Sequence, residues 1–239
     1  MTSTPEGAAS GVEIPLGGGR SVDGVVRVGD TVRRPAVFAT QLMRDVLVHL
    51  ERVGFDAAPR WLGLDDQGRD VLSFVEGETF SDCRGIVWRD EQLAASARLL
   101  RRYHDAVGGS TLAAGEEVVG HGDYGPWNLI WRDCVPCCVI DFDTAYPGRR
   151  ADDIGYALWK HLNLGLVDLA PAQQRRRARV FVDAYGLDVD AAGAIEGAQE
   201  QAQVRFAEHG WQEALDELAA ERAWLAANRA AFSGEDRLM

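Results

Sequence analysis

The chain has no long apolar run and no excess of basic residues. No stretch approaches the roughly 20 apolar residues that a membrane-spanning helix needs, so we expect no association with a membrane. Among its 239 residues, 37 Asp and Glu outnumber 25 Lys and Arg, which gives a formal net charge of -12. Nucleic acids attract basic surfaces, so they are not expected partners. An acidic surface is compatible with a small cationic substrate.

The start of the sequence lacks the pattern of a secretory signal. Residues 1–11 are small and polar, without a basic segment followed by an apolar one. We therefore expect a flexible tail over residues 1–13 and a cytoplasmic location.

Cysteine is scarce, with four residues in the chain. Cys134, Cys137 and Cys138 form C-x-x-C-C, a spacing that can indicate metal or redox chemistry. A structural zinc site needs four ligands, and no second cysteine pair or nearby histidine pair completes one. The thiols are therefore expected to be structural and, in a cytoplasmic protein, reduced.

The first third of the chain has the pattern of a small antiparallel sheet with one inserted helix. Gly29-Asp30 predicts a tight turn between two short strands. Phe38, Leu42, Val46 and Leu50 recur every four residues, which predicts one face of a helix. The expected strands are 25–28, 31–34, 60–64 and 70–75.

From residue 90 onward the sequence is mainly helical, apart from one hairpin that joins residues 129–131 to 138–140. The expected helices are 90–107, 152–163, 171–185, 189–209 and 211–232. The chain is thus predicted to be α+β, with an N-terminal lobe over residues 14–78 and a C-terminal lobe over residues 79–239.

Two motifs carry the chemistry. His121 to Asn128 reads H-G-D-Y-G-P-W-N, and Val139 to Asp143 reads V-I-D-F-D after a short hairpin. Four residues separate Asp123 from Asn128, as in the D-x-x-x-x-N of a kinase catalytic loop, and Asp141 follows a strand. Asp, Asn, Gly and Pro also cluster in ordinary turns. That alternative explains one motif but not the two together at this spacing.

Phosphoryl transfer needs a positioned hydroxyl, Mg²⁺ on the phosphates and donors that hold the triphosphate. Asp123 is the candidate that accepts or orients the proton of the attacking hydroxyl. Asn128 and Asp141 offer the hard oxygen ligands that Mg²⁺ prefers. His121 is expected to brace the loop.

The segments HGDYGPWNLIW and VIDFDTAYPGRRADDIGYAL resemble the aminoglycoside phosphotransferase and choline kinase family. The resemblance is specific over residues 121–158 and weak over the C-terminal helices. It implies a two-lobed protein-kinase-like fold, with a small antiparallel β N-lobe and a mainly helical C-lobe. It also implies a kinase that requires Mg²⁺, uses ATP or GTP and phosphorylates a hydroxyl of a small molecule.

By motif position, the resemblance implies that Asp123 is the catalytic aspartate and that Asn128 and Asp141 are the metal ligands. Asp143 completes the family's D-x-D and is expected to be structural. Asp153 resembles a later family aspartate that braces the same lobe.

The residues that would bind the nucleotide are less clearly indicated than the catalytic ones. Gly18 and Gly19 belong to a glycine run that could fold over the phosphates, although a flexible connector has the same composition. Family members place Lys or Arg on the second or third strand. Strand alternation lets one of Arg33 and Arg34 face the cleft; Arg34 is preferred and Arg33 is the alternative. The backbone groups of Ser73 and Val75 could contact the base at the hinge.

One feature of a kinase is missing. A glutamate on the helix after the third strand is expected, but none occupies a suitable place within residues 38–53. This departure keeps open a catalytically inactive, kinase-like nucleotide-binding module. A protein kinase is disfavoured because the chain lacks D-F-G and A-P-E segments.

The acceptor is not identified by the sequence, and neither is the oligomeric state. Aromatic and acidic residues of the C-terminal helices could line an acceptor pocket, although such residues more often belong to the core or to a solvated face. They are Trp159, His161, Trp211, Trp224, Glu208, Glu213 and Asp216.

Overall fold

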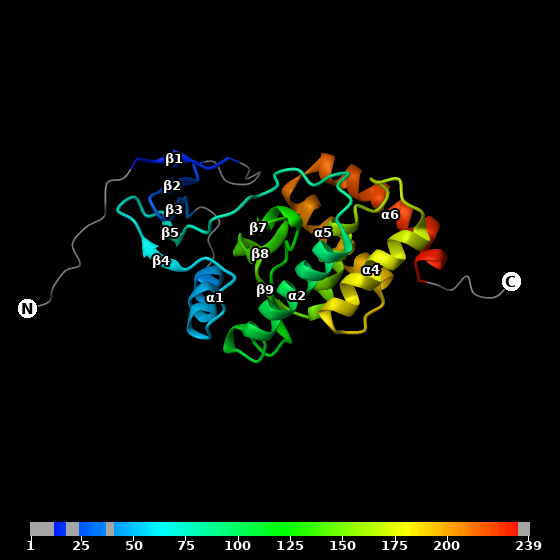
Figure 1. Cartoon of the computed structure of the whole chain (residues 1–239), viewed down its shortest axis with the longest axis horizontal. Coiled ribbons are helices and arrows are strands. Elements are labelled where there is room, and N and C mark those ends of the chain that lie inside the picture. The colour runs from blue at the N-terminus through cyan, green and yellow to red at the C-terminus, as the bar shows by residue number, and fades with distance from the viewer. Residues whose placement is uncertain (1–11, 18–23, 37–40, 234–239) are drawn as a thin grey trace, which may run out of the picture.

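The computed structural model describes residues 12–17, 24–36 and 41–233. Most of the tail predicted over residues 1–13 lies outside these ranges, as do Gly18, Gly19 and Phe38. The described chain forms two lobes (Figure 1). A small sheet with helix α1 lies at one end, and a bundle of helices forms the other.

The first lobe is an antiparallel five-stranded sheet in the order β1-β2-β3-β5-β4. A tight turn at Gly29, with φ 58°, joins β2 to β3. The pairing of β3 with β5 sets Arg34 opposite Asp70. The strands are β1 (Ile14–Pro15), β2 (Val26–Val28), β3 (Thr31–Arg34), β4 (Trp61–Leu64) and β5 (Asp70–Ser73).

Helix α1 (Gln41–Arg52) packs with an apolar face shifted from the predicted one. Its buried residues are Met43, Val46, Leu47 and Leu50, which follow the i, i+3, i+4, i+7 spacing of an amphipathic helix. The simple four-residue repeat predicted Leu42 in this stripe, but Leu42 is only partly buried, because 3.6 residues per turn rotate a strict four-residue repeat off one face.

The second lobe contains five helices and two strand pairs in its described part. β6 pairs with β9 and β7 pairs with β8, both antiparallel. The sequence pattern did not predict β9. The elements are α2 (Asp90–Val107), β6 (Val118–Gly120), β7 (Leu129–Arg132), β8 (Val135–Val139), β9 (Tyr146–Gly148), α3 (Arg150–Leu162), α4 (Pro171–Tyr185), α5 (Ala191–His209) and α6 (Gln212–Ser233).

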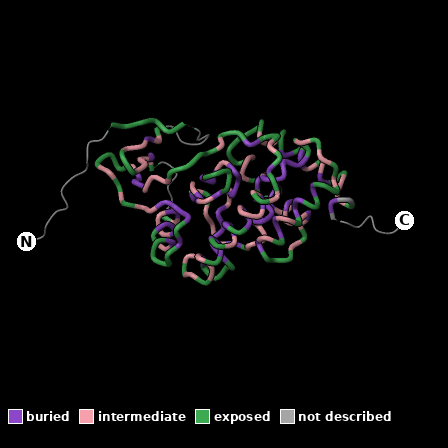
Figure 2. The backbone as a smooth tube through the Cα atoms, in the orientation of Figure 1, coloured by how far each residue is buried: buried purple, intermediate pink, exposed green. Residues whose placement is uncertain are grey.

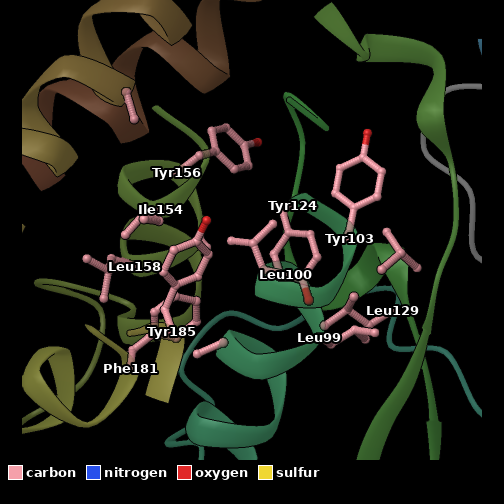
Figure 3. Close-up of a cluster of buried hydrophobic side chains, with 14 of the residues drawn as sticks. Leu99, Leu100, Tyr103, Tyr124, Leu129, Ile154, Tyr156, Leu158, Phe181 and Tyr185 are labelled. Carbon is pink, nitrogen blue, oxygen red and sulfur yellow. The ribbon is translucent and has the colours of Figure 1, made fainter. Parts of the chain in front are cut away.

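The core of this lobe gathers side chains from α2, α3, α4 and the loop after β6 (Figure 3). Leu100, Tyr124, Ile154 and Phe181 are fully buried there. Buried chain is concentrated in these elements and along α1, whereas β1 is exposed (Figure 2). The loop that carries the first motif is thus anchored directly to the core through Tyr124.

Helices α3 and α5 approach each other closely at a glycine. A Cβ atom built at Gly155 would overlap the carbonyl group of Ala194. The absence of a side chain at Gly155 therefore lets α5 lie against α3 beside the motif loop.

The segment between the lobes is held against β7. Glu78 and Trp131 exchange two backbone hydrogen bonds of 2.8 Å each. A Cβ at Gly77, where φ is 148°, would overlap the side chain of Ile130. The lobe boundary between residues 78 and 79 stays a prediction. No helix within the described ranges is long and apolar enough to cross a membrane.

A buried histidine predicts how stability depends on pH. His161 lies between the Ser96 hydroxyl at 2.9 Å and the Ala157 carbonyl oxygen at 2.8 Å. Burial lowers the pKa of His161 from 6.5 to about 4. Between these pH values the unfolded chain binds a proton that the folded chain does not. The free energy of unfolding should therefore fall as pH drops, by up to about 1.4 kcal/mol per pH unit.

Urea unfolding at pH 7, 6 and 5 measures this dependence. In His161→Gln, the part of the pH dependence of the unfolding free energy that comes from His161 should be lost. His209→Gln removes an exposed histidine and should retain it. Equal pH dependence in the two variants would show that His161 is not the source.

Candidate active site

The loop after β6 brings Asp123 and Asn128 into contact. Asn128 Nδ2 donates to the Asp123 backbone oxygen at 2.9 Å and to Asp123 Oδ2 at 2.8 Å. Both partners are acceptors, so the amide nitrogen must face Asp123 and the amide oxygen must point the other way. The Tyr156 hydroxyl donates to Asp123 Oδ1, and Trp127 Nε1 donates to Oδ2 at 3.3 Å. Both carboxylate oxygens are thus oriented by fixed donors.

His121 lies where a loop brace is expected. Its Nε2 donates to the Ile140 carbonyl oxygen at 3.0 Å, and its Nδ1 accepts from the Asp123 backbone N–H at 3.3 Å. This pair of contacts assigns a neutral ring protonated on Nε2. The imidazole thus ties the first motif loop to the residue that precedes Asp141.

Asp153 braces the same loop from the first turn of α3. It is fully buried and accepts from the backbone N–H groups of His121 at 2.5 Å and Gly122 at 2.9 Å, and from His104 Nε2 at 3.0 Å. Burial opposes ionisation, but the hydrogen bond and charge of His104 and the backbone hydrogen bond of Gly122 outweigh it, so the pKa of Asp153 is lowered. Asp153 therefore braces the loop as a charged carboxylate.

The second motif meets β3 through Arg34. Asp141 adopts a left-handed conformation with φ 64° and ψ 64°, which is uncommon for a residue other than glycine. Arg34 Nη1 lies 3.4 Å from Asp141 Oδ1, and Arg34 Nη2 pairs with Asp143 Oδ2. Arg33 points to the opposite face, where its Nε lies 3.8 Å from Asp65 Oδ2. Of the two arginines, Arg34 is therefore the one beside the motif.

Two buried polar atoms at this contact have no partner among the described residues. They are Arg34 Nε, a donor, and Asp143 Oδ1, an acceptor. Burial first, and then the charge of Asp141, raise the pKa of Asp143 although Arg34 opposes the change. A buried polar atom without a hydrogen-bond partner destabilises the folded protein. A polar ligand bound here could supply the missing partners.

The donor set fits Mg²⁺ that is shared with phosphates. Asn128 and Asp141 supply hard oxygens, and the Asp141 side chain is 42% exposed. Within the described ranges, no group of three or more His, Cys, Asp or Glu could hold a metal ion by itself. Mg²⁺ at nucleotide sites typically uses one or two protein carboxylates together with substrate phosphates and water. The residues present match that arrangement and not a closed protein cage.

Helix α1 and the sheet are joined by an ion pair other than the expected one, because it does not include Arg34 of β3. Arg44 of α1 pairs with Asp70 of β5 through Nε–Oδ1 at 2.9 Å and Nη2–Oδ2 at 3.3 Å. Trp61 Nε1 also donates to Asp70 at 2.9 Å, and Asp70 is fully buried. The helix thus supplies the base and the strand supplies the acid. The sequence did not predict this pair, because Asp70 follows a turn and its partner is 26 residues away.

At the hinge between the lobes, the backbone groups of Ser73 and Val75 differ in whether they already form hydrogen bonds within the protein. The Ser73 N–H donates to the Arg60 carbonyl oxygen at 2.9 Å, and Ser73 Oγ accepts from the Arg60 N–H at 2.8 Å. No backbone hydrogen bond joins Val75 to another described residue. The predicted base contact is therefore better suited to Val75 than to the Ser73 N–H.

The residues proposed from sequence for the acceptor pocket are not gathered at Asp123. Trp159 and His161 are core residues, and Trp211 is 48% exposed. The acidic candidates Glu208, Glu213 and Asp216 are exposed on α5 and α6, and Trp224 is partly buried.

Instead, a cavity of about 160 Å³ lies beside the motif loop, with Gly122, Tyr156 and Arg205 in its wall. Sequence reasoning missed Tyr156 and Arg205 as site residues. Tyr156 follows Asp153 by three positions and so shares its helix face, which could have indicated its place in the site. No feature of the sequence indicated Arg205.

The cysteine segment lies on the β7–β8 hairpin. Burial raises the pKa of Cys138 to about 12, and burial also raises the pKa of Cys83 to about 12. Both are therefore protonated thiols at neutral pH, as expected of structural cysteines.

The family assignment follows from matched sequence. Residues 88–195 match the model of the phosphotransferase enzyme family. The chain is also 32% identical over 218 residues to the trifolitoxin immunity protein of Rhizobium leguminosarum bv. trifolii, covering 78% of this chain and 82% of that relative. The chain belongs to the phosphotransferase enzyme family. This confirms the resemblance read from the two motifs.

Solved structures of phosphotransferases share the fold. A GDP complex of aminoglycoside 2'-phosphotransferase-IIIa has a TM-score of 0.59 at 15% identity, covering 90% of this chain and 94% of that one. A choline/ethanolamine kinase family protein from Mesorhizobium loti has a TM-score of 0.58 at 14% identity, covering 94% and 89%. A macrolide 2'-phosphotransferase from Brachybacterium faecium has a TM-score of 0.55 at 16% identity, covering 90% and 88%. The predicted two-lobed, protein-kinase-like fold is confirmed.

Proposed function

We propose that this phosphotransferase is a kinase that transfers the γ-phosphoryl group of ATP, or of GTP, to a hydroxyl group of a small molecule. The observation that carries the proposal is the convergence of Asp123, Asn128, Asp141 and Arg34 from two lobes. Relatives solved with GDP, ADP and ATP support a nucleotide donor.

In the proposed reaction, Asp123 accepts a hydrogen bond from the acceptor hydroxyl and holds its oxygen in line with the γ-phosphorus. The oxygen forms a bond to phosphorus while the bond from phosphorus to the bridging β-oxygen breaks. The nucleoside diphosphate leaves with that electron pair, and the hydroxyl proton passes to Asp123 or to water.

Arg34, Asn128 and Asp141 position the donor in this proposal. The Arg34 guanidinium would balance phosphate charge. Asn128 and Asp141 would hold Mg²⁺, which neutralises charge on the phosphates when it is bound. Tyr156 and Trp127 keep the Asp123 carboxylate in one orientation through their hydrogen bonds.

A second candidate is binding without turnover. A relative of this chain carries the name of a toxin immunity protein, which supports a protective role against a toxic compound. Phosphorylation of that compound is the proposed means, and binding of it by an inactive module is the alternative. The absent helix glutamate motivates the inactive module, whereas the set of Asp123, Asn128 and Asp141 argues against it.

The deciding experiment measures ADP release from ATP across a panel of hydroxyl compounds, with and without Mg²⁺. The panel should include aminoglycosides, choline-like alcohols, sugars and hydroxy acids. Stimulation by one class, dependent on Mg²⁺, is expected. Asp141→Asn should lower turnover at least about a hundredfold. Asp133→Asn changes an exposed turn carboxylate of the adjacent hairpin and should retain activity.

If no compound stimulates ADP release but the protein still binds ATP, the inactive module is favoured. If the protein neither releases ADP nor binds ATP, the nucleotide assignment itself is overturned.

A further inference from the structure

The cavity beside the motif loop opens next to Asp123. Asp123 follows Gly122 in the chain and accepts the hydrogen bond of Tyr156, and both of these residues line the cavity. Its volume is about 160 Å³. The wall consists of Gly122 from the loop, Tyr146 of β9, Tyr156 of α3 and, from α5, two alanines with Gln201 and Arg205.

Arg205 is the charged residue of this wall. Its Nη1 donates to the Gly122 carbonyl oxygen at 3.2 Å, and its guanidinium carbon lies 5.8 Å from the Tyr156 ring centroid. The Tyr156 hydroxyl is a second hydrogen-bond partner of Arg205. A guanidinium has five N–H donors, so these two contacts leave donors available. Among the described residues, no carboxylate forms an ion pair with Arg205. The cavity thus contains a cation without a counter-charge.

Two carboxylates contact residues of the wall, and both are engaged there: Asp153 accepts from the Gly122 N–H at 2.9 Å, and Asp123 accepts from the Tyr156 hydroxyl. Two acidic residues of α6 are also engaged. Glu221 accepts from Trp159 Nε1 at 2.8 Å and lies 4.0 Å from Lys160 Nζ. Glu217 pairs with Arg84 at 3.1 Å. A cationic acceptor that approached Asp123 through the cavity would meet Arg205 and no acidic wall residue, and like charges repel.

We propose that Arg205 forms an anion subsite, so that the acceptor carries a carboxylate close to the hydroxyl that is phosphorylated. The planar guanidinium matches a carboxylate through two parallel hydrogen bonds. The transfer to that acceptor rests on the proposed function, whereas the binding of the anion does not.

Three probes of similar size and different charge test the subsite. Glycerate is an anion, glycerol is neutral and 3-aminopropane-1,2-diol is a cation, and each carries hydroxyl groups. Their affinities are obtained from the concentration dependence of thermal unfolding at constant ionic strength. Each variant is compared with its own ligand-free unfolding temperature, so a change in basal stability does not enter the result.

Glycerate should bind the wild-type protein at least about tenfold more tightly than the cation. Arg205→Gln should weaken glycerate binding about tenfold to a hundredfold. Gln keeps a polar side chain but removes the charge. Arg205→Lys should retain part of the preference, because it keeps the charge but loses the planar fork. Arg98→Gln, at an exposed site on α2, should leave glycerate binding unchanged.

Equal binding of the three probes, or glycerate binding that survives in Arg205→Gln, would overturn the subsite. Transfer to a cationic acceptor with a KM unchanged in Arg205→Gln would also overturn it while the kinase proposal stands. Anion-selective binding controlled by Arg205, with no transfer to any hydroxyl compound, would sustain the subsite and overturn the kinase proposal.

Discussion

Asp123→Asn is expected to lower kcat by about 10²- to 10⁴-fold, the usual contribution of a group that accepts or orients a proton in the transition state. The KM for ATP should change little, because the phosphates contact other residues in the proposed site. The substitution also replaces one acceptor oxygen by an amide NH2 group, so either Tyr156 loses its acceptor or Asn128 keeps only the backbone oxygen of residue 123. Initial rates of ADP formation with a saturating acceptor measure the effect.

Tyr156→Phe is the matched control for this prediction. It removes one hydrogen bond to Asp123 and leaves the carboxylate in place. Because only the orientation of Asp123 is weakened, the expected loss in kcat is smaller than in Asp123→Asn, about tenfold to a hundredfold at most, the effect of one hydrogen bond to a charged group. Full activity in Asp123→Asn would exclude Asp123 from the chemistry, and equal losses in both variants would assign Asp123 a structural role.

Asp153→Ala is expected to lower the free energy of unfolding by about 3 to 5 kcal/mol, as when one partner of a buried charged pair is removed. The change would leave His104 and the N–H groups of His121 and Gly122 buried without their acceptor. Urea unfolding at pH 7 measures it. Asp152→Ala changes the adjacent residue, whose partner Arg149 is exposed, and should cost about 1 kcal/mol or less.

The pH dependence of the same variant gives a second test. The pKa of Asp153 is lowered in the folded protein. Its contribution is therefore fully present above the unfolded pKa of about 3.9 and is lost as pH falls through the lower folded pKa. The wild-type protein and Asp153→Ala should converge in stability in strong acid. A difference between them that does not change with pH would show that the loss comes from packing and not from the charge.

The sequence by itself determined the family, the fold class and the local chemistry of the two motifs. The spacing of Asp123 and Asn128 spans one loop, and Asp141 directly follows a strand, so short-range turn and strand patterns were enough to place them. Alternation along β3 also separated Arg33 from Arg34 onto opposite faces. The helices of the second lobe followed from apolar periodicity and glycine terminators.

Only the tertiary structure decided which distant side chains meet. The Arg44–Asp70 pair, the contact of Arg34 with the second motif and the position of Arg205 against Gly122 join residues 26 to 109 positions apart. Such contacts leave no local period, because they depend on how packed elements lie against each other. The helical period likewise could not show whether Trp159 and His161 belong to the core or line a pocket, since both environments favour the same aromatic residues. The packing of α5 against α3, made close by Gly155, decided that Arg205 and not an acidic residue faces the loop of Asp123.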